Sequence, residues 1–87
     1  MPDAYNLYFY RDAEKDLSGI PAKDTRRIMD RIKNLRNDPR PRGCEKLSAL
    51  ERYRLRQGVW RILYEIDDDE RELNIVKIAH RKEAYRR

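Results

Sequence analysis

Three arginines with strand-like spacing are the residues of this sequence best suited to chemistry on an anion. Arg54 and Arg56 alternate with Tyr53 and Leu55, and Arg61 follows shortly after them. Because side chains along a strand point alternately to its two faces, the two arginines share one face and the two apolar residues share the other. Guanidinium groups stay charged and pair with phosphate oxygens through planar N–H donors. The pattern therefore predicts an anion-binding surface built from neighbouring strands.

A second set of candidates lies at the end of the chain, over residues 80–87. This segment carries four cations, one carboxylate, Tyr85 and His80, which is the sole histidine. Imidazole and phenol groups can exchange protons with a ribose hydroxyl or a leaving oxygen, which arginine does poorly. Taken alone, a single histidine or tyrosine is more often structural than reactive. Beside a surface lined by arginines, both become candidates for proton transfer.

The composition favours a polyanionic partner. The chain has 87 residues, 43% of them charged, and a formal net charge of +5. A chain of this length buries only about 60% of its unfolded surface, so we expect one domain over residues 1–87. Cys44 and His80 are the only residues of their types, which excludes a disulfide framework and a Cys/His zinc site. Without a leader pattern or a stretch of about 20 apolar residues, we expect a cytoplasmic protein that does not enter membranes.

Hydrophobic periodicity divides the first half of the chain into a strand and two helices. The aromatic stretch over residues 5–10 contains no helix breaker and is too short for a lone helix, so it predicts a strand. Helical spacing of apolar residues starts at Asp12 and stops at Pro21. A longer helix with a clear apolar stripe is predicted from Thr25 to Leu35.

Strands dominate the second half. Residues 39–44 indicate an exposed loop, and residues 45–51 show no clear pattern. Residues 52–79 predict two or three strands, connected at Gln57-Gly58 and at an acidic turn. The expected order of elements is β-α-α-β-β-β, followed by a short basic tail or one helical turn over residues 80–87. This order predicts an α+β fold.

Alternation in the later strands gathers cations on one face of the sheet. If the two helices cover the apolar face, four cations lie close together on the open face: Arg54, Arg56, Arg61 and Lys77. Like charges on adjacent strands repel, so we favour an anion-binding surface. In the alternative interpretation, ordinary surface salt bridges worth roughly 0 to 1 kcal/mol each neutralise the arginines. The carboxylates available for this are Glu45, Glu51 and Glu65, and for Arg52 we favour such a pair.

Strict alternation in the last strand also fixes the expected position of the histidine. Val76 and Ile78 share one face, and Ile75 and Lys77 share the other. His80 then lies on the face of Val76 and Ile78, away from the cations. This placement counts against a catalytic role for His80.

A longer motif joins these residues. The stretch from Tyr53 to Tyr64 resembles the YRxRxGxYRxxY core of the RelE/ParE superfamily of small bacterial toxins from toxin/antitoxin modules, with Trp60 at an aromatic position. The ending from His80 to Tyr85 is similar to the HRxxxY ending of the RelE branch. Supporting matches follow the second helix: Leu35–Pro39, Gly43 and Lys46-Leu47. Nearly the whole chain takes part in the resemblance.

The resemblance implies a fold, an activity and partners. The implied fold has two N-terminal helices packed on a twisted, mostly antiparallel four-stranded sheet, with the first strand inserted beside the later ones. The implied activity is that of an RNA endonuclease that enters the ribosomal A site and cuts messenger RNA during translation. A RelB-like antitoxin restrains such a toxin, and an acidic, partly disordered antitoxin would suit a chain of charge +5.

The resemblance also implies the site residues. Arg54 and Arg56 match basic residues of the family's second strand, and Arg61 matches the arginine that contacts the scissile phosphate. The C-terminal basic and tyrosine positions correspond to Arg81 and Tyr85. Some members carry lysines where this chain has Arg54 and Arg56, and others rely on histidine. Because arginine is a poor proton acceptor, the identity of the general base stays open.

We expect cleavage without a metal or other cofactor. RNA supplies its own nucleophile in the 2′-hydroxyl, and the carboxylates that could bind a metal crowd into the acidic turn, away from the basic face. Arg61 and Arg56 are expected to clamp the phosphate with help from Arg81. His80 or Tyr85, with Tyr85 slightly favoured, is expected to move protons, and the product is a 2′,3′-cyclic phosphate.

Three alternatives remain open at this level. ParE-branch toxins share the YRxRxGxYRxxY core but poison DNA gyrase without nuclease chemistry, so the HRxxxY-like ending is what favours RNA cleavage. A non-catalytic RNA-binding module would show steep salt dependence and no product ends. A detoxified remnant of an active toxin would keep the motif and have no activity.

Overall fold

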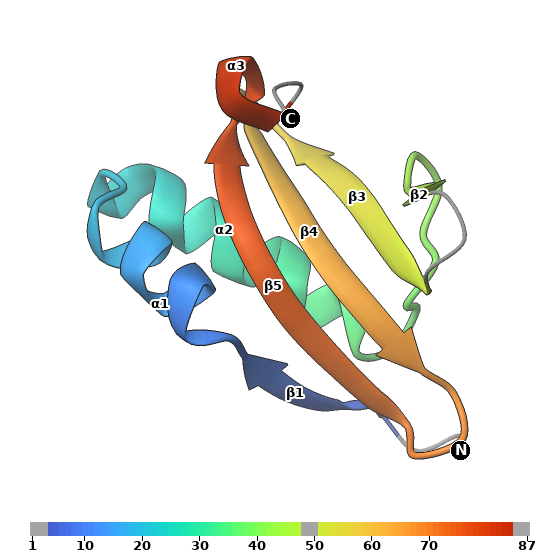
Figure 1. Ribbon diagram of the computed structural model, residues 1–87. Coiled ribbons are helices and arrows are strands. Elements are labelled where there is room, and N and C mark those ends of the chain that lie inside the picture. The colour runs from blue at the N-terminus through green and yellow to red at the C-terminus, as the bar shows by residue number, and fades with distance from the viewer. Residues whose placement is uncertain (1–3, 48–50, 85–87) are drawn as a thin grey trace.

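The computed structural model describes residues 4–47 and 51–84, and its elements follow the expected order (Figure 1). No helix within the described residues is long and apolar enough to span a membrane. The elements are β1 (Asn6–Phe9), α1 (Arg11–Ser18), α2 (Ala22–Leu35), β2 (Glu45–Leu47), β3 (Arg52–Gln57), β4 (Trp60–Asp67), β5 (Glu72–His80) and α3 (Arg81–Ala84).

The strands form one mixed sheet in the order β1-β5-β4-β3-β2. β1 runs parallel to β5, and the other neighbours are antiparallel. Figure 1 shows α2 crossing behind the central strands, so that the face toward the viewer carries no helix; we call it the open face. The predicted α+β fold is confirmed. The sheet has five strands rather than four, because β2 is a three-residue edge strand that is too short to show alternation in the sequence.

The core lies between α2 and the covered face of the sheet. Ile28, Ile32 and Leu35 are buried because their spacing places them on one stripe of the helix. Tyr64 and Ile62 of the central strand β4 are also fully buried. The remaining buried sheet residues of the same cluster are Tyr53, Leu55, Ile66, Leu73, Ile75 and Ile78.

A β-bulge in β5 changes the alternation expected for this strand. Leu63 pairs with Lys77, but the next residue of β4, Tyr64, pairs with Ile75, so Val76 is the extra residue. Ile75 and Ile78 are consequently both buried. The prediction that they lie on opposite faces was wrong, because one inserted residue shifts the two-residue period.

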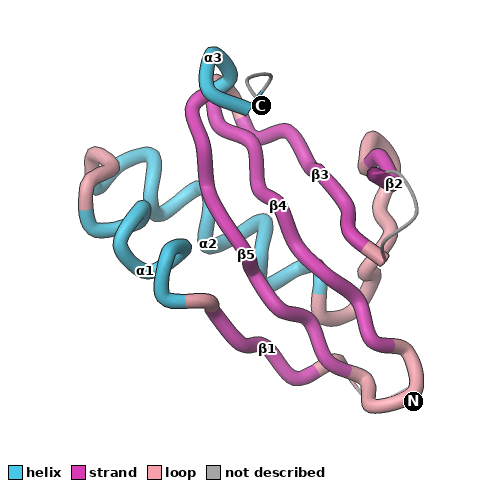
Figure 2. The backbone as a smooth tube through the Cα atoms, in the orientation of Figure 1, coloured by secondary structure: helices cyan, strands magenta, loops and turns pink. Residues whose placement is uncertain are grey.

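Both outer strands are short, and α1 continues where β1 ends (Figure 2). β1 pairs with only the first part of β5, up to Ile75. Beyond that point the backbone N–H of Ile78 donates to the Asp16 carboxylate of α1 at 2.9 Å. The side chain of Asp16 therefore occupies the edge of β5 that β1 leaves open.

Candidate functional site

The strand register brings Arg56 and Arg61 together on the open face. The two residues are direct cross-strand partners in β3 and β4, and Arg61 lies opposite Ala79 of β5. Arg54, two residues before Arg56, is on the same face and pairs with Leu63. Directly opposed side chains in an antiparallel pair have Cβ atoms only about 5 Å apart. The predicted convergence of the three arginines on one face is therefore present in the fold.

Arg61 is buried, although it belongs to the open face. Only 6% of the residue is exposed, and it is the one charged residue among the buried side chains of the described chain. Its Nη1 donates to the carbonyls of Gly58 and Trp60, both at 2.9 Å, while its Nε has no hydrogen-bond partner within the described residues. Gly58 has a φ of +60°, a conformation that glycine adopts without strain. The two-residue hairpin turn thus fixes the Arg61 guanidinium.

The other two arginines differ in their environment. Arg54 Nε and Nη2 donate to the Glu45 carboxylate at 3.1 and 3.0 Å, so the salt-bridge interpretation is correct for this residue. Arg56 is exposed, and no ion pair to it is found within residues 4–47 and 51–84. The expected pair of Arg52 is confirmed, with Nε 2.8 Å from Glu65. Arg56 is therefore the member of the cluster most open to an external anion.

Lys77, the fourth expected cation, is directed to the sheet edge. Its Nζ lies 3.3 Å from both carboxylate oxygens of Asp16. Lys77 is thus engaged by α1, and the cluster on the open face consists of the arginines.

His80 lies on the covered face, opposite the arginines. It pairs with Trp60 across β4 and β5, and the two rings pack edge to face with centroids 5.5 Å apart. The backbone N–H of Lys82 donates to His80 Nδ1 at 3.2 Å. Trp60 Nε1 in turn donates to Asp24 of α2. These contacts hold the imidazole away from Arg61, as alternation predicted.

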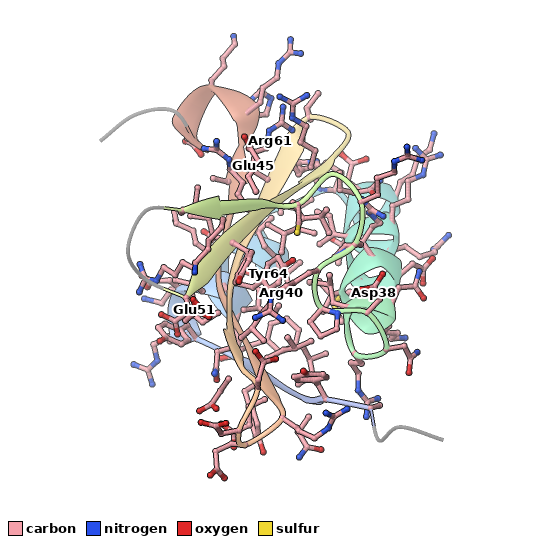
Figure 3. The ribbon with its side chains drawn as sticks, turned by 90° about the vertical axis from the view of Figure 1, so that its right-hand side faces the viewer. Asp38, Arg40, Glu45, Glu51, Arg61 and Tyr64 are labelled. Carbon is pink, nitrogen blue, oxygen red and sulfur yellow. The ribbon has the colours of Figure 1, made fainter. Side chains whose placement is uncertain are left out.

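The C-terminal cation Arg81 is the first residue of α3 and contacts the β3–β4 hairpin. Its backbone N–H donates to the carbonyl of Val59 in the β3–β4 hairpin at 2.6 Å, and its side chain is exposed. Figure 3 shows Arg61 at the end of the sheet where α3 begins, well away from Arg40 and Tyr64. Arg56, Arg61 and Arg81 therefore share one end of the molecule. Tyr85, the other C-terminal candidate, lies outside the described residues.

A separate polar network at the other end of the sheet is structural. Arg40 donates to Tyr53 at 3.0 Å and to both oxygens of Asp68, which also accepts from Tyr5 at 2.7 Å. Hydrogen bonds from Arg40 and Tyr5 lower the pKa of Asp68. This network ties the loop after α2 to the acidic turn, so the turn is occupied in holding the fold together.

Two exposed tyrosines on the open face were not predicted as site residues. Tyr8 pairs with Asn74 of β5, and the Tyr10 hydroxyl donates to Glu65 at 2.7 Å. They are 46% and 42% exposed. Alternation within residues 5–10 could have identified them, because positions 8 and 10 have the same parity.

Comparison with known proteins identifies the family of this chain. The model of the ParE toxin family of type II toxin–antitoxin systems matches residues 7–85. The chain is therefore a type II toxin of the RelE/ParE superfamily. It is 29% identical to a putative toxin RelE1 of Methanocaldococcus jannaschii, over 94% of this chain and 96% of that protein. It is 28% identical to the toxin RelG of Mycobacterium tuberculosis, over 95% and 98% of the respective chains.

Solved structures place the toxin in the same fold. The toxin–antitoxin complex RelBE2 of Mycobacterium tuberculosis contains a chain that is 25% identical, with a TM-score of 0.78, covering 88% of this toxin and 98% of that chain. The resemblance to the RelE/ParE superfamily seen in the motif is thus confirmed along nearly the whole chain, and the named relatives are RelE-type toxins.

Proposed function

We propose that this toxin is a metal-independent endonuclease that cuts messenger RNA in the ribosomal A site. The proposal is carried by the direct cross-strand pairing of Arg56 and Arg61 at the end of the open face. Like charges at directly opposed positions repel each other, and an anion bound there replaces this repulsion with charge-assisted hydrogen bonds. The RelE-type names of relatives along nearly the full length of the chain support the assignment. Such an activity takes place in the cytoplasm.

Each arginine has a separate role in the proposed reaction. Arg56, the exposed arginine of the cluster, binds the phosphate, and Arg81 contributes a further positive charge from the start of α3. Arg61 stabilises the charge that develops on the phosphorane, and its fixed position avoids reorganisation during the reaction. The Arg54 guanidinium is already bound by Glu45, so we assign Arg54 to positioning the substrate and not to clamping the reacting phosphate.

The substrate supplies the nucleophile. Its 2′-oxygen forms a bond to phosphorus, the bond to the 5′-oxygen breaks, and the products are a 2′,3′-cyclic phosphate and a 5′-hydroxyl. The proton leaves the 2′-hydroxyl for a general base, and another is delivered to the 5′-oxygen. Tyr85 is our principal candidate for these transfers, since His80 packs on Trp60 at the covered face.

The central test is Arg61→Ala. We expect messenger cleavage, measured by sequencing transcript ends after a short pulse of expression, to fall by roughly 10²- to 10³-fold and growth inhibition to disappear. Arg11→Ala, at the exposed start of α1, is the matched control and should cut like the wild type. Undiminished cutting by a folded Arg61→Ala variant would remove the phosphate-clamp role.

The proton-transfer roles need their own comparison. We expect Tyr85→Phe to slow cleavage by roughly 10²- to 10⁴-fold. We expect His80→Gln to cut at close to the wild-type rate because its ring lies on the covered face. If both variants cut at the wild-type rate, the proton-transfer assignment must be abandoned.

Inhibition of DNA gyrase is the second candidate, because the matching family model is that of ParE toxins. Supercoiling by purified gyrase in the presence of the purified toxin separates the two functions. We expect no inhibition; inhibition without new transcript ends would assign the toxin to the gyrase class. Absence of both new transcript ends and gyrase inhibition would indicate a binding module or a detoxified remnant.

The proposed protein partner is a RelB-like antitoxin. The Mycobacterium tuberculosis relative of known structure was solved as a toxin–antitoxin complex. Co-expression with the neighbouring gene product should abolish growth inhibition and yield a complex that survives gel filtration. Persistent growth inhibition under co-expression would contradict this pairing.

A further inference from the structure

The open face carries an aromatic pair as well as cations. Tyr8 and Tyr10 lie on the same face of the sheet as the arginines, because Tyr8 pairs with Asn74, Asn74 pairs with Glu65, and Glu65 has the parity of Arg61. Both rings keep more than 40% of their surface exposed. Neighbouring exposed aromatic rings on the same face as a charged cluster are candidates for a contact surface for a ligand.

The Tyr10 ring is held in place. Its hydroxyl donates to one Glu65 oxygen at 2.7 Å, while Arg52 Nε donates to the other at 2.8 Å. Burial favours the neutral form of this carboxyl, but the hydrogen bonds from Tyr10 and Arg52 outweigh it and lower the pKa of Glu65. The charge of the Glu65 carboxylate is thus neutralised by its partners. The Tyr10 ring is already fixed across β5, so ligand binding does not have to order it.

We propose that Tyr8 and Tyr10 form an aromatic platform on which a base of the RNA strand stacks, a few nucleotides from the cut. This inference rests on the proposed nuclease function and extends it along the open face. Aromatic rings beside a basic groove are the usual way in which proteins hold single-stranded RNA. Four residues of β4, or about 13 Å, separate Arg61 from Glu65, which a short stretch of extended RNA spans.

The charges around the platform select a base rather than a phosphate. A cleft adjoins the platform on the side away from the arginines. Its lining includes Asn74 and five carboxylates: Glu51, Glu65, Asp67, Asp68 and Asp69. Phosphates are repelled from this cleft and attracted to the arginines, so the strand crosses the platform with its backbone toward the arginine end. An uncharged base is the part of the strand that suits the tyrosines.

Binding of labelled 2′-O-methyl oligonucleotides, measured by fluorescence anisotropy at low salt, tests the platform. We expect the Tyr8→Ala, Tyr10→Ala double variant to bind roughly 5- to 150-fold more weakly than the wild type. The variant Tyr8→Phe keeps its ring and should bind like the wild type. An abasic sugar–phosphate oligomer should bind equally to the wild type and to the double variant, because it carries no base to stack. Circular dichroism checks that each variant is folded.

The outcomes separate the platform from the nuclease. Equal affinity of wild type and double variant for the base-containing oligonucleotide, or no binding by the wild type, would overturn the platform. The platform would also be overturned if the double variant bound the abasic oligomer more weakly than the wild type does. It would likewise be overturned if the tyrosine variants bound RNA normally but no longer bound the antitoxin. Oligonucleotide binding that depends on the tyrosines, without cleavage on ribosomes, would refute the nuclease function and support the platform. Cleavage on ribosomes, with oligonucleotide binding that does not depend on the tyrosines, would refute the platform and support the nuclease function.

Discussion

Replacing Arg56 by glutamine should stabilise the fold while it weakens the toxin. Arg56 lies directly opposite Arg61 in the β3–β4 pair, and no ion pair to Arg56 is found in the described parts of the chain. Directly opposed like charges destabilise a sheet by roughly 0.2 to 1 kcal/mol. For a domain of this size, 1 kcal/mol corresponds to about 4 to 8 °C in melting temperature, so we expect Arg56→Gln to raise Tm by about 1 to 8 °C.

Salt provides an internal check on the origin of the gain. At about 1 M salt the Debye length falls to about 3 Å, so repulsion involving the exposed Arg56 is largely screened. Melting followed by circular dichroism should therefore show the increase in Tm at low salt and its loss at high salt. Arg42→Gln, which removes the same charge from an exposed loop position, is the matched control.

Two results would refute this reasoning. If Arg56→Gln melts at or below the wild-type temperature in low salt, the arginine pair does not strain the sheet. If Arg42→Gln gives the same increase, the gain comes from a lower net charge and not from the pair. The proposed function further predicts that messenger cleavage by Arg56→Gln falls, because function and stability make opposite demands on this residue.

Three further predictions follow from individual contacts. Tyr64→Phe removes the hydroxyl that donates to the Pro39 carbonyl at 2.7 Å in the interior, so the free energy of unfolding in urea should fall by roughly 1 to 3 kcal/mol; an unchanged value would show that water replaces the bond. The pKa of Glu65 lies below its ordinary value of 4.5, so its stabilising contribution is present above that pH and is lost on acidification. As the pH is lowered through about 4.5, the melting temperature of the wild type should therefore decrease, and that of Glu65→Gln should decrease less. Parallel curves of melting temperature against pH for the two proteins would contradict this. Glu45→Gln removes the carboxylate that binds Arg54. Under the proposed function this change should steepen the log–log salt dependence of RNA binding by up to about 0.7, whereas an unaltered slope would mean that Arg54 does not reach the strand.

Strand alternation was sufficient to predict the arginine face. The two-residue period of β3 and β4 is uninterrupted between them, so Arg54, Arg56 and Arg61 fall on the open face as expected. The same rule failed in β5, where the bulge at Val76 inserts one residue. Nothing in the composition of residues 72–80 marks this bulge, since apolar residues stand on both sides of it.

The environment of each arginine could not be predicted from its position in a strand. Glu45 lies in a stretch without a recognisable period and reaches Arg54 only because β2 pairs with β3. The burial of Arg61 depends on how its side chain folds back on the hairpin carbonyls, which is a property of the turn geometry. The sequence predicts which face a residue occupies; the partners it meets there are set by pairing between segments that are distant in the chain.

The short outer strands have a consequence for the toxin on its own. A long, bare outer strand offers unpaired amide and carbonyl groups to a second copy of the same chain. Here one edge strand, β1, is four residues long and is followed by α1, whose Asp16 accepts a hydrogen bond from the backbone N–H of Ile78. The other edge strand, β2, is three residues long and carries Glu45 and Lys46. Neither edge strand offers much of a template for self-association, so we expect the isolated toxin to stay dispersed as single molecules.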